Sequence, residues 1–330
     1  MIKRTIEISR DAAHLAVRNR QLLVQRDGKT IGSIPCEDVG VVLVDHPAAT
    51  YSHAALAALA DSDAALVVCG RNHLPTAMLL PLADHSQVVW RINDQLNASK
   101  PLQKQLWRQL IQAKIRAQAA NLPPHSRARS KLLDMARGVR SGDPNNVEAH
   151  AARVYWQHFL PDHRFRRDAD GDGLNSLLNY GYAVVRAAVA RAIVAAGLMP
   201  AIGLKHSNRS NAFCLADDLI EPLRPLVDDR ARDLREQGYD RLTSEAKTGL
   251  LSLLADPVWI TGERSPLMVS LHRYCASLVK CFRGEAKSLE IPTSRDPKGN
   301  REIEIAEASD ADGQISPTTR SRHSQELETP

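Results

Sequence analysis

The chain has 330 residues with 43 Lys and Arg, 38 Asp and Glu, a formal net charge of +5 and a pI near 9.0. This length allows two domains, and the basic balance is compatible with nucleic-acid binding without demonstrating it. Aromatic residues make up only 4% of the chain, so the core is expected to consist of Leu, Val, Ile and Ala, which favours helix. Arg186 and Arg191 interrupt the most apolar run, at 183–204, and argue against a membrane span.

The five cysteines form no CxxC pair, and each lies among apolar residues. An odd number of cysteines without framework spacing predicts buried thiols in a reducing compartment. The N-terminus alternates like a strand and lacks the apolar core of a signal peptide. We therefore expect a cytoplasmic protein.

Residues 1–85 are expected to form a small strand-rich domain. Short apolar runs separated by turn signals predict strands, and the continuous apolar run at 39–44 is typical of a strand buried on both faces. An alanine-rich helix is expected at 51–60. The pattern indicates a small sandwich or mixed sheet with one inserted helix.

Helical patterns dominate after a linker at 86–98, and we expect a helical domain over 99–284. An amphipathic helix over 100–120 is predicted to expose Lys104, Arg108, Lys114 and Arg116. Further basic residues follow at 127–140. A solvated surface explains one such helix, but the additional arginines make a phosphate-binding groove a comparable interpretation.

The segment DPNNVE at 143–148 predicts a helix start, with Asp143 as the cap and Pro144 in the first turn. Glu148 lies one turn into this helix. A glutamate there usually complements the helix dipole, so its position alone indicates no function.

Residues 167–175 place Asp168, Asp170 and Asp172 at the spacing of a calcium-binding loop. The twelfth position, however, is Asn179 instead of a bidentate glutamate. A simple turn before the next helix is the preferred interpretation.

Residues 174–228 predict two packed helices joined by a loop that carries His206. The first helix is expected to end at Gly197, and the second to begin near residue 210 and to place Asp217, Asp218 and Glu221 within one turn. Closely spaced acids repel unless a cation compensates. One imidazole with several carboxylates favours a Mg²⁺ or Mn²⁺ site, whereas the alternative is an ordinary loop histidine beside a solvated helix face.

Two further helices are expected at 242–254 and 267–282. Residues 285–330 are rich in Ser, Thr, Asp, Glu and Pro and contain few large apolar residues. We therefore predict a disordered tail there.

Five segments together resemble a known family. These are IPCEDVGVVLVD (34–45), HLPTAMLLPL (73–82), DPNNVEAHAA (143–152), LNYGYAVVR (178–186) and NAFCLADDLIEPLRP (211–225). In this order they resemble the CRISPR-associated spacer-acquisition integrases, the "Cas one" endonuclease family, and most closely its type II members. The resemblance covers about residues 1–283.

The resemblance implies an α+β fold in which a small β-rich N-terminal domain, which dimerises, precedes a larger all-helical catalytic domain. It implies that Glu148, His206 and Glu221 bind one Mg²⁺ or Mn²⁺ ion and carry the catalysis, with Asp217 and Asp218 as supporting acids. Charge alone adds Arg164, Arg166 and Arg167 as candidate DNA contacts.

The implied activity is insertion of foreign DNA into a CRISPR array, by attack of a 3′-hydroxyl on a repeat phosphodiester. The implied partners are duplex DNA, a second copy of the chain, a small "Cas two" dimer that completes a heterohexamer, and the RNA-guided effector nuclease of type II systems. Two alternatives remain open at this point: a DNA-binding scaffold without chemistry, and an RNA-processing metallonuclease.

Overall fold

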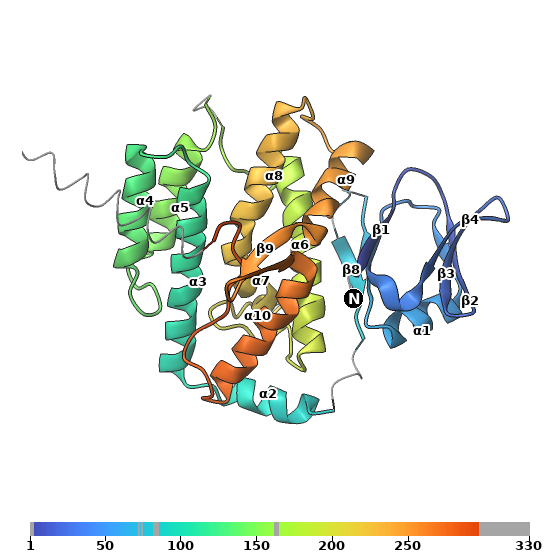
Figure 1. Cartoon of the computed structure of the whole chain (residues 1–330), viewed down its shortest axis with the longest axis horizontal. Helices are drawn as coiled ribbons and strands as arrows, with labels where there is room; N and C mark the ends of the chain where they lie inside the picture. The colour runs from blue at the N-terminus through green and yellow to red at the C-terminus, as the bar shows by residue number, and fades with distance from the viewer. Residues whose placement is uncertain (1–2, 72, 74, 82–85, 162–164, 297–330) are drawn as a thin grey trace, which may run out of the picture.

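The computed structural model describes residues 3–71, 73, 75–81, 86–161 and 165–296. A strand-rich N-terminal part is followed by a larger helical part, and the two lie side by side (Figure 1). The predicted α+β class is therefore confirmed. Each of the five cysteines is free.

The described residues of the N-terminal part contain two four-stranded sheets, the helix α1 and the 3₁₀ turn η1 (Cys36–Asp38). The first sheet has the order β1-β5-β7-β8, in which β1, β5 and β7 are parallel and β8 is antiparallel; the second has the order β4-β3-β2-β6. The elements are β1 (Arg4–Ile8), β2 (His14–Arg18), β3 (Gln21–Arg26), β4 (Lys29–Pro35), β5 (Val39–Val44), β6 (Thr50–Tyr51), α1 (His53–Asp61), β7 (Ala65–Cys69) and β8 (Pro75–Leu79).

Strand β5 belongs to both hydrophobic cores of the molecule. Its side chains alternate between the two faces of the sheet: Val42 and Val44 pack in the core between the N-terminal sheets and α1. Val41 and Leu43, on the opposite face, pack in the large core of the helical part. The prediction of a strand buried on both sides is confirmed.

The helical part surrounds α6, which is buried along most of its length. Although α6 is long and apolar enough to cross a membrane, 78% of its apolar window is buried inside the protein, as in the core helix of a globular domain. The elements are α2 (Val88–Leu96), α3 (Lys100–Ala120), α4 (Arg127–Gly138), α5 (Val147–His158), α6 (Leu174–Ala195), α7 (Cys214–Ile220), the 3₁₀ turn η2 (Glu221–Leu223), α8 (Arg224–Glu236), α9 (Ser244–Ser252), β9 (Pro257–Ile260), β10 (Glu263–Pro266) and α10 (Leu267–Phe282).

Three segments differ from the sequence-based expectation. The predicted linker at 86–98 contains α2, and the antiparallel hairpin β9–β10 interrupts the helical part. The predicted tail starts too early, because the segment around Leu289 and Ile291 packs on the helical core and Thr293 pairs with Trp259. Residues 297–330 lie outside the described part of the chain.

Arg191 joins the N-terminal part to the helical part. Its side chain lies on α6 and is 1% exposed. The guanidinium donates to the backbone oxygen of Asp63 at 2.5 Å and to Oδ2 of the same residue at 2.6 Å, and it lies 3.0 Å from Nε2 of His272 on α10. The buried charge of Arg191 therefore has a partner in Asp63, whose side chain is 28% exposed.

Replacing Arg191 by leucine is expected to lower the free energy of unfolding by about 1–3 kcal/mol, because it removes a charged donor to the backbone oxygen and the carboxylate of Asp63. Arg137→Leu is the matched control, since Arg137 forms an exposed pair with Asp134 and its loss costs about 0–1 kcal/mol. Chemical denaturation of both variants measures the difference. Equal losses in the two variants would contradict the role given to Arg191.

Candidate active site

Glu148 and Glu221 meet at one ammonium group of the helical part, where Glu221 is buried and Glu148 is half-buried. Nζ of Lys114, on α3, donates to Oε1 of Glu148 at 2.6 Å and to Oε2 of Glu221 at 2.5 Å. The two glutamates come from α5 and from the end of α7, and Lys114 is only 9% exposed. Three separate elements thus bring two carboxylates around one cation.

The start of α5 fixes the position of Glu148. The carboxylate of Asp143 accepts from the backbone N–H of Val147 at 2.9 Å and of Glu148 at 3.1 Å. The helix begins at Val147, after Asn146 in a left-handed conformation with φ of 51°. Asp143 therefore caps the first turn as predicted, although from a position farther from the helix, and Pro144 lies outside the helix.

Glu221 is held where α7 gives way to the 3₁₀ turn η2. Pro222 follows it, and the side chain is 7% exposed. Its second oxygen, Oε1, accepts from Nε of Arg224 at 2.8 Å. Burial opposes ionisation of this carboxyl, but Arg224 and Lys114 outweigh the burial and lower the pKa of Glu221 to about 2.

His206 forms a second cluster with Asp218. Its Nδ1 lies 2.6 Å from Oδ1 of Asp218, whose side chain is fully buried. The same carboxylate accepts from the backbone N–H groups of Leu204, Lys205 and His206 at 2.6–3.2 Å. The hydrogen bond to Asp218 raises the pKa of His206. Asp218 therefore fixes both the loop and the imidazole, whose other nitrogen, Nε2, stays available to a ligand.

Asp217 faces a different set of groups. It accepts from Nε of Arg186 at 2.5 Å and from Nδ2 of Asn211 at 2.6 Å. Arg186 also lies over the ring of Phe213, 4.8 Å from its centroid. Asp217 thus stabilises the connection between α6 and α7.

Helix α3 lies behind both clusters. Trp107 makes an edge contact with the ring of His206, with centroids 5.8 Å apart, and Lys114 lies two turns further along the helix. Among the described residues, no group of three or more His, Cys, Asp and Glu side chains is arranged to hold a metal ion. In the structure Glu148 and Glu221 share one cluster, whereas His206 belongs to a separate cluster with Asp218. Asp218 precedes Glu221 by one helical turn.

The donor chemistry of the two clusters fits a hard divalent cation. Because one ammonium reaches both Glu148 and Glu221, a single small cation between them can also contact both carboxylates. Carboxylate oxygens with one imidazole suit Mg²⁺ or Mn²⁺. An imidazole that donates its other N–H to a carboxylate is the usual arrangement of a metal-binding histidine.

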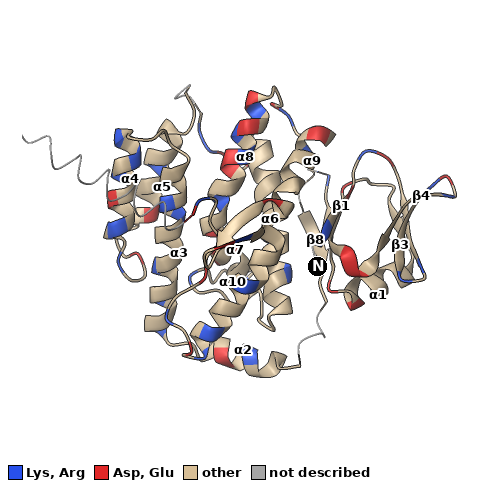
Figure 2. Cartoon of the chain, viewed as in Figure 1, with Lys and Arg blue, Asp and Glu red and all other residues tan. Residues whose placement is uncertain are grey.

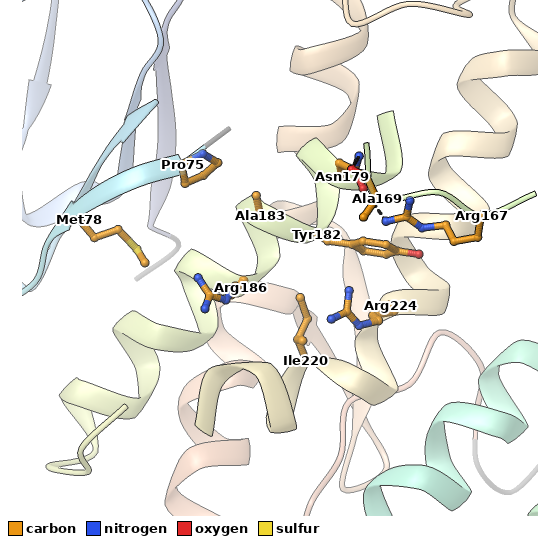
Figure 3. A pocket seen from close by; sticks show the side chains of 10 residues that line it. All are labelled: Pro75, Met78, Arg167, Ala169, Asn179, Tyr182, Ala183, Arg186, Ile220 and Arg224. Carbon is orange, nitrogen blue, oxygen red and sulfur yellow. Dashed lines mark hydrogen bonds between the residues drawn. The ribbon is translucent and has the colours of Figure 1, made fainter. Parts of the chain in front are cut away.

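An open cavity of about 290 Å³ lies between β8 and α6 and is lined by Ile220 and Arg224, which come just before and after Glu221 in the chain (Figure 3). Arg167, Arg186 and Arg224 line it together with Tyr182. The guanidinium groups of Arg167 and Arg224 lie 5.4 Å and 4.7 Å from the centroid of the Tyr182 ring. Guanidinium groups are common partners of phosphate groups, although Arg186 and Arg224 are already paired with Asp217 and Glu221.

The three arginines predicted to contact DNA have different surroundings. Arg164 lies outside the described residues, and Arg166 is exposed. Arg167 is half-buried and donates to the amide oxygens of Asn175 at 3.1 Å and Asn179 at 2.5 Å. Only Arg167 of this group is thus shown to line the cavity beside the candidate site.

The segment at 167–175 forms a turn. The backbone N–H of Asp170 donates to Oδ1 of Asp168 at 3.0 Å, and that of Asp168 donates to Oδ1 of Asn175 at 2.9 Å. These three aspartates are not arranged as a metal site in the described part of the chain. The turn interpretation therefore agrees with the structure.

Two basic residues that were counted as surface charge are buried. Lys114, predicted to be exposed, lies between the two glutamates, and Arg129 is 3% exposed and donates to the backbone oxygen of Ala119. Lys and Arg still outnumber Asp and Glu along α4 (Figure 2). The basic surface therefore remains, but it contains fewer lysines and arginines than the sequence indicated.

Sequence reasoning missed Lys114, Arg224 and Trp107 as parts of the site. A signal for Lys114 was present, because it follows Leu110 and Ile111 at helical spacing and precedes Gln118 on the same buried stripe of α3. A lysine in such a stripe requires an anionic partner. No comparable pattern distinguishes Arg224.

Asp228 accepts a hydrogen bond from the hydroxyl of Tyr182, which lines the cavity. It is fully buried, and burial raises its pKa to about 7, although the hydrogen bonds from Tyr182 and Tyr155 oppose the shift. The folded protein therefore keeps a proton that the unfolded chain, with a pKa near 3.8, has released. Because the folded state binds more protons, the free energy of unfolding falls as the pH rises from 3.8 to about 7.

Asp228→Asn is expected to remove this decline in stability. The Tm of the variant minus that of the wild type should become more positive between about pH 5 and about pH 8. Differential scanning calorimetry across this range measures the difference. A difference that stays constant with pH would show that Asp228 does not titrate in this window.

A family model and a relative of known family both match this chain over most of its length. A model of the CRISPR-associated protein Cas1 family matches residues 6–239. The CRISPR-associated endonuclease Cas1 of Neisseria meningitidis serogroup C is 40% identical over 283 residues, which cover 84% of this chain and 92% of the relative.

Solved structures share the fold at low sequence identity. A casposase bound to its integration product has a TM-score of 0.71 at 20% identity and covers 94% of this chain and 99% of its own. A chain of a Cas6-RT-Cas1–Cas2 complex has a TM-score of 0.70 at 19% identity and covers 89% of this chain and 36% of its own.

Proposed function

The chain belongs to the Cas1 family of CRISPR-associated proteins, and from this membership we propose that it is a metal-dependent DNA endonuclease and integrase. In this role it inserts foreign DNA fragments into a CRISPR array as new spacers. Identity of 40% with an endonuclease of the family, over most of both chains, supports the activity.

One structural observation carries the proposal: Glu148 and Glu221 converge on a single cation from different helices. Two carboxylates this close repel each other, and a cation between them compensates the repulsion. We propose that these glutamates and Nε2 of His206 are the ligands of one Mg²⁺ or Mn²⁺ ion. When bound, such an ion polarises a phosphodiester and stabilises the charge that develops during its attack.

The surrounding residues hold the ligands and the DNA. Asp218 fixes the orientation of His206, and Arg224 holds one oxygen of Glu221. Arg167 and Arg186 line the adjacent cavity, and we propose that they bind backbone phosphates without reading bases. In the integration reaction the 3′-hydroxyl oxygen of the captured DNA end bonds to the phosphorus of the repeat, and one ester oxygen of the repeat leaves. With water as the attacking group the same site cleaves DNA.

We propose binding partners for this chain from the complexes in which similar proteins have been solved. The likeness to a chain of a Cas6-RT-Cas1–Cas2 complex supports a small Cas2 dimer as partner, in a heterohexamer with homodimers of this chain. The likeness to a casposase bound to an integration product supports duplex DNA as substrate, as protospacer and as repeat. An RNA-guided effector nuclease is an additional proposed partner in the cytoplasm.

A strand-transfer assay tests the function. Purified protein is mixed with a short duplex that has free 3′-hydroxyls and with a supercoiled plasmid that carries the cognate repeat, with the Cas2 partner added or omitted. Joined product is expected with Mg²⁺ or Mn²⁺ and not with EDTA. Glu148→Ala, Glu221→Ala and His206→Ala should each reduce the rate by about 100-fold or more, because each removes a ligand.

The same assay separates the alternatives. DNA binding without joining or cleavage, equal in the wild type and the three variants, would establish a scaffold. Preferential cleavage of RNA over duplex and branched DNA would establish an RNA-processing nuclease instead. Either outcome would overturn the integrase proposal.

Asp218 and Asp217 are adjacent residues whose substitution is expected to change metal binding to different extents. Asp218→Asn should weaken Mn²⁺ binding by about 10–100-fold, because the imidazole of His206 loses the carboxylate that orients it. Asp217→Asn should leave Mn²⁺ binding within about threefold of the wild type, since Asp217 contacts Arg186 and Asn211. Isothermal titration calorimetry compares the two, and equal effects would show that Asp218 does not act through His206.

A further inference from the structure

Lys114 occupies the position between the two glutamates that a cation would take. Its ammonium lies 2.6 Å from Glu148 and 2.5 Å from Glu221, so it contacts the oxygens that a divalent ion would need. Lys114 is a buried residue in the middle of α3, flanked by the buried residues Ile111 and Ile115. The helix and the core therefore determine the backbone position of Lys114.

The charges around the pair balance without any added ion. Glu148 and Glu221 contribute two negative charges, while Lys114 and Arg224 contribute two positive charges within hydrogen-bond distance. A divalent ion that entered beside Lys114 would give this partly buried group a net charge of about +2, which is unfavourable around the buried side chains of Lys114 and Glu221. The ion and the ammonium also need the same carboxylate oxygens.

We propose that Lys114 is a resident counter-cation, which holds Glu148 and Glu221 together before metal binding and is displaced from them by the divalent ion. Metal loading is then an exchange of cations at a preassembled pair of carboxylates. The ammonium prevents the repulsion that would separate the empty ligands, and it lowers the apparent metal affinity by competition. This inference rests on the proposed metal site.

A purely structural ion pair makes a different prediction. If Lys114 only stabilised the fold, its replacement would weaken or leave unchanged the binding of metal, because the ligands would lose their order. If Lys114 competes with the ion, its replacement strengthens the binding of metal even though it destabilises the metal-free protein. Competition thus predicts tighter Mn²⁺ binding when Lys114 is replaced, whereas a purely structural role predicts unchanged or weaker binding.

The test is Mn²⁺ binding to the full chain without DNA, measured by isothermal titration calorimetry, together with the Tm with and without Mn²⁺. Lys114→Met keeps the length and apolar stem of the side chain and removes the charge. We expect this variant to bind Mn²⁺ about tenfold or more tightly than the wild type, with a lower Tm without metal and a larger gain in Tm on adding Mn²⁺. Lys104→Met, an exposed position on the same helix, is the matched control and should bind as the wild type does.

Unchanged or weaker Mn²⁺ binding by folded Lys114→Met would overturn the inference. Lys114→Gln, which keeps an N–H donor near the carboxylates, replaces it if the Met variant does not fold. A crystal of the wild type soaked in MnCl₂ gives an independent measurement: Nζ should leave hydrogen-bond distance of both glutamates. An ion bound to both glutamates with Nζ still in place would also overturn the inference.

The failures of the two proposals are distinguishable. If neither the wild type nor Lys114→Met binds Mn²⁺, and Glu148→Ala changes nothing, the metal site itself is wrong. If the wild type binds Mn²⁺ and Glu148→Ala abolishes the binding, while Lys114→Met does not strengthen it, only the role of Lys114 is wrong.

Discussion

Two carboxylates held close together inside the protein impose the main constraint on this structure. Glu148 and Glu221 lie on different helices, and their repulsion must be compensated before either helix can pack as it does. Helix α3 supplies Lys114 for this purpose, and α8 begins with Arg224. The packing of α3, α5, α7 and α8 is therefore coupled to the electrostatics of one buried centre.

The same centre shows how local chain geometry places functional groups. Asp143 sets the start of α5, so the position of Glu148 depends on a cap and not on the interior of the helix. Asp218 uses one buried carboxylate to hold both the backbone and the ring of His206. Glu148 and His206 are thus each positioned by a neighbouring aspartate.

Long periodic segments allowed most of the fold to be predicted. The run at 39–44 and the helix at 174–195 were identified because many residues repeat one pattern. The short helix α2 and the hairpin β9–β10 were missed, since few residues in each carry a periodic signal. For the site, position 148 alone indicated nothing, and the resemblance supplied its role. Lys114 was assigned to the surface by its charge, although its place in an apolar stripe indicated burial.

The shared strand β5 has a consequence for how the molecule unfolds. Its alternate side chains complete the cores on both sides of the first sheet, so neither core is closed without it. Local opening of the N-terminal sheets would strip Val41 and Leu43 from the helical core at the same moment. We therefore expect the strand-rich and helical parts to unfold as a single cooperative unit, and a chain cut after β8 to leave two fragments with exposed apolar faces.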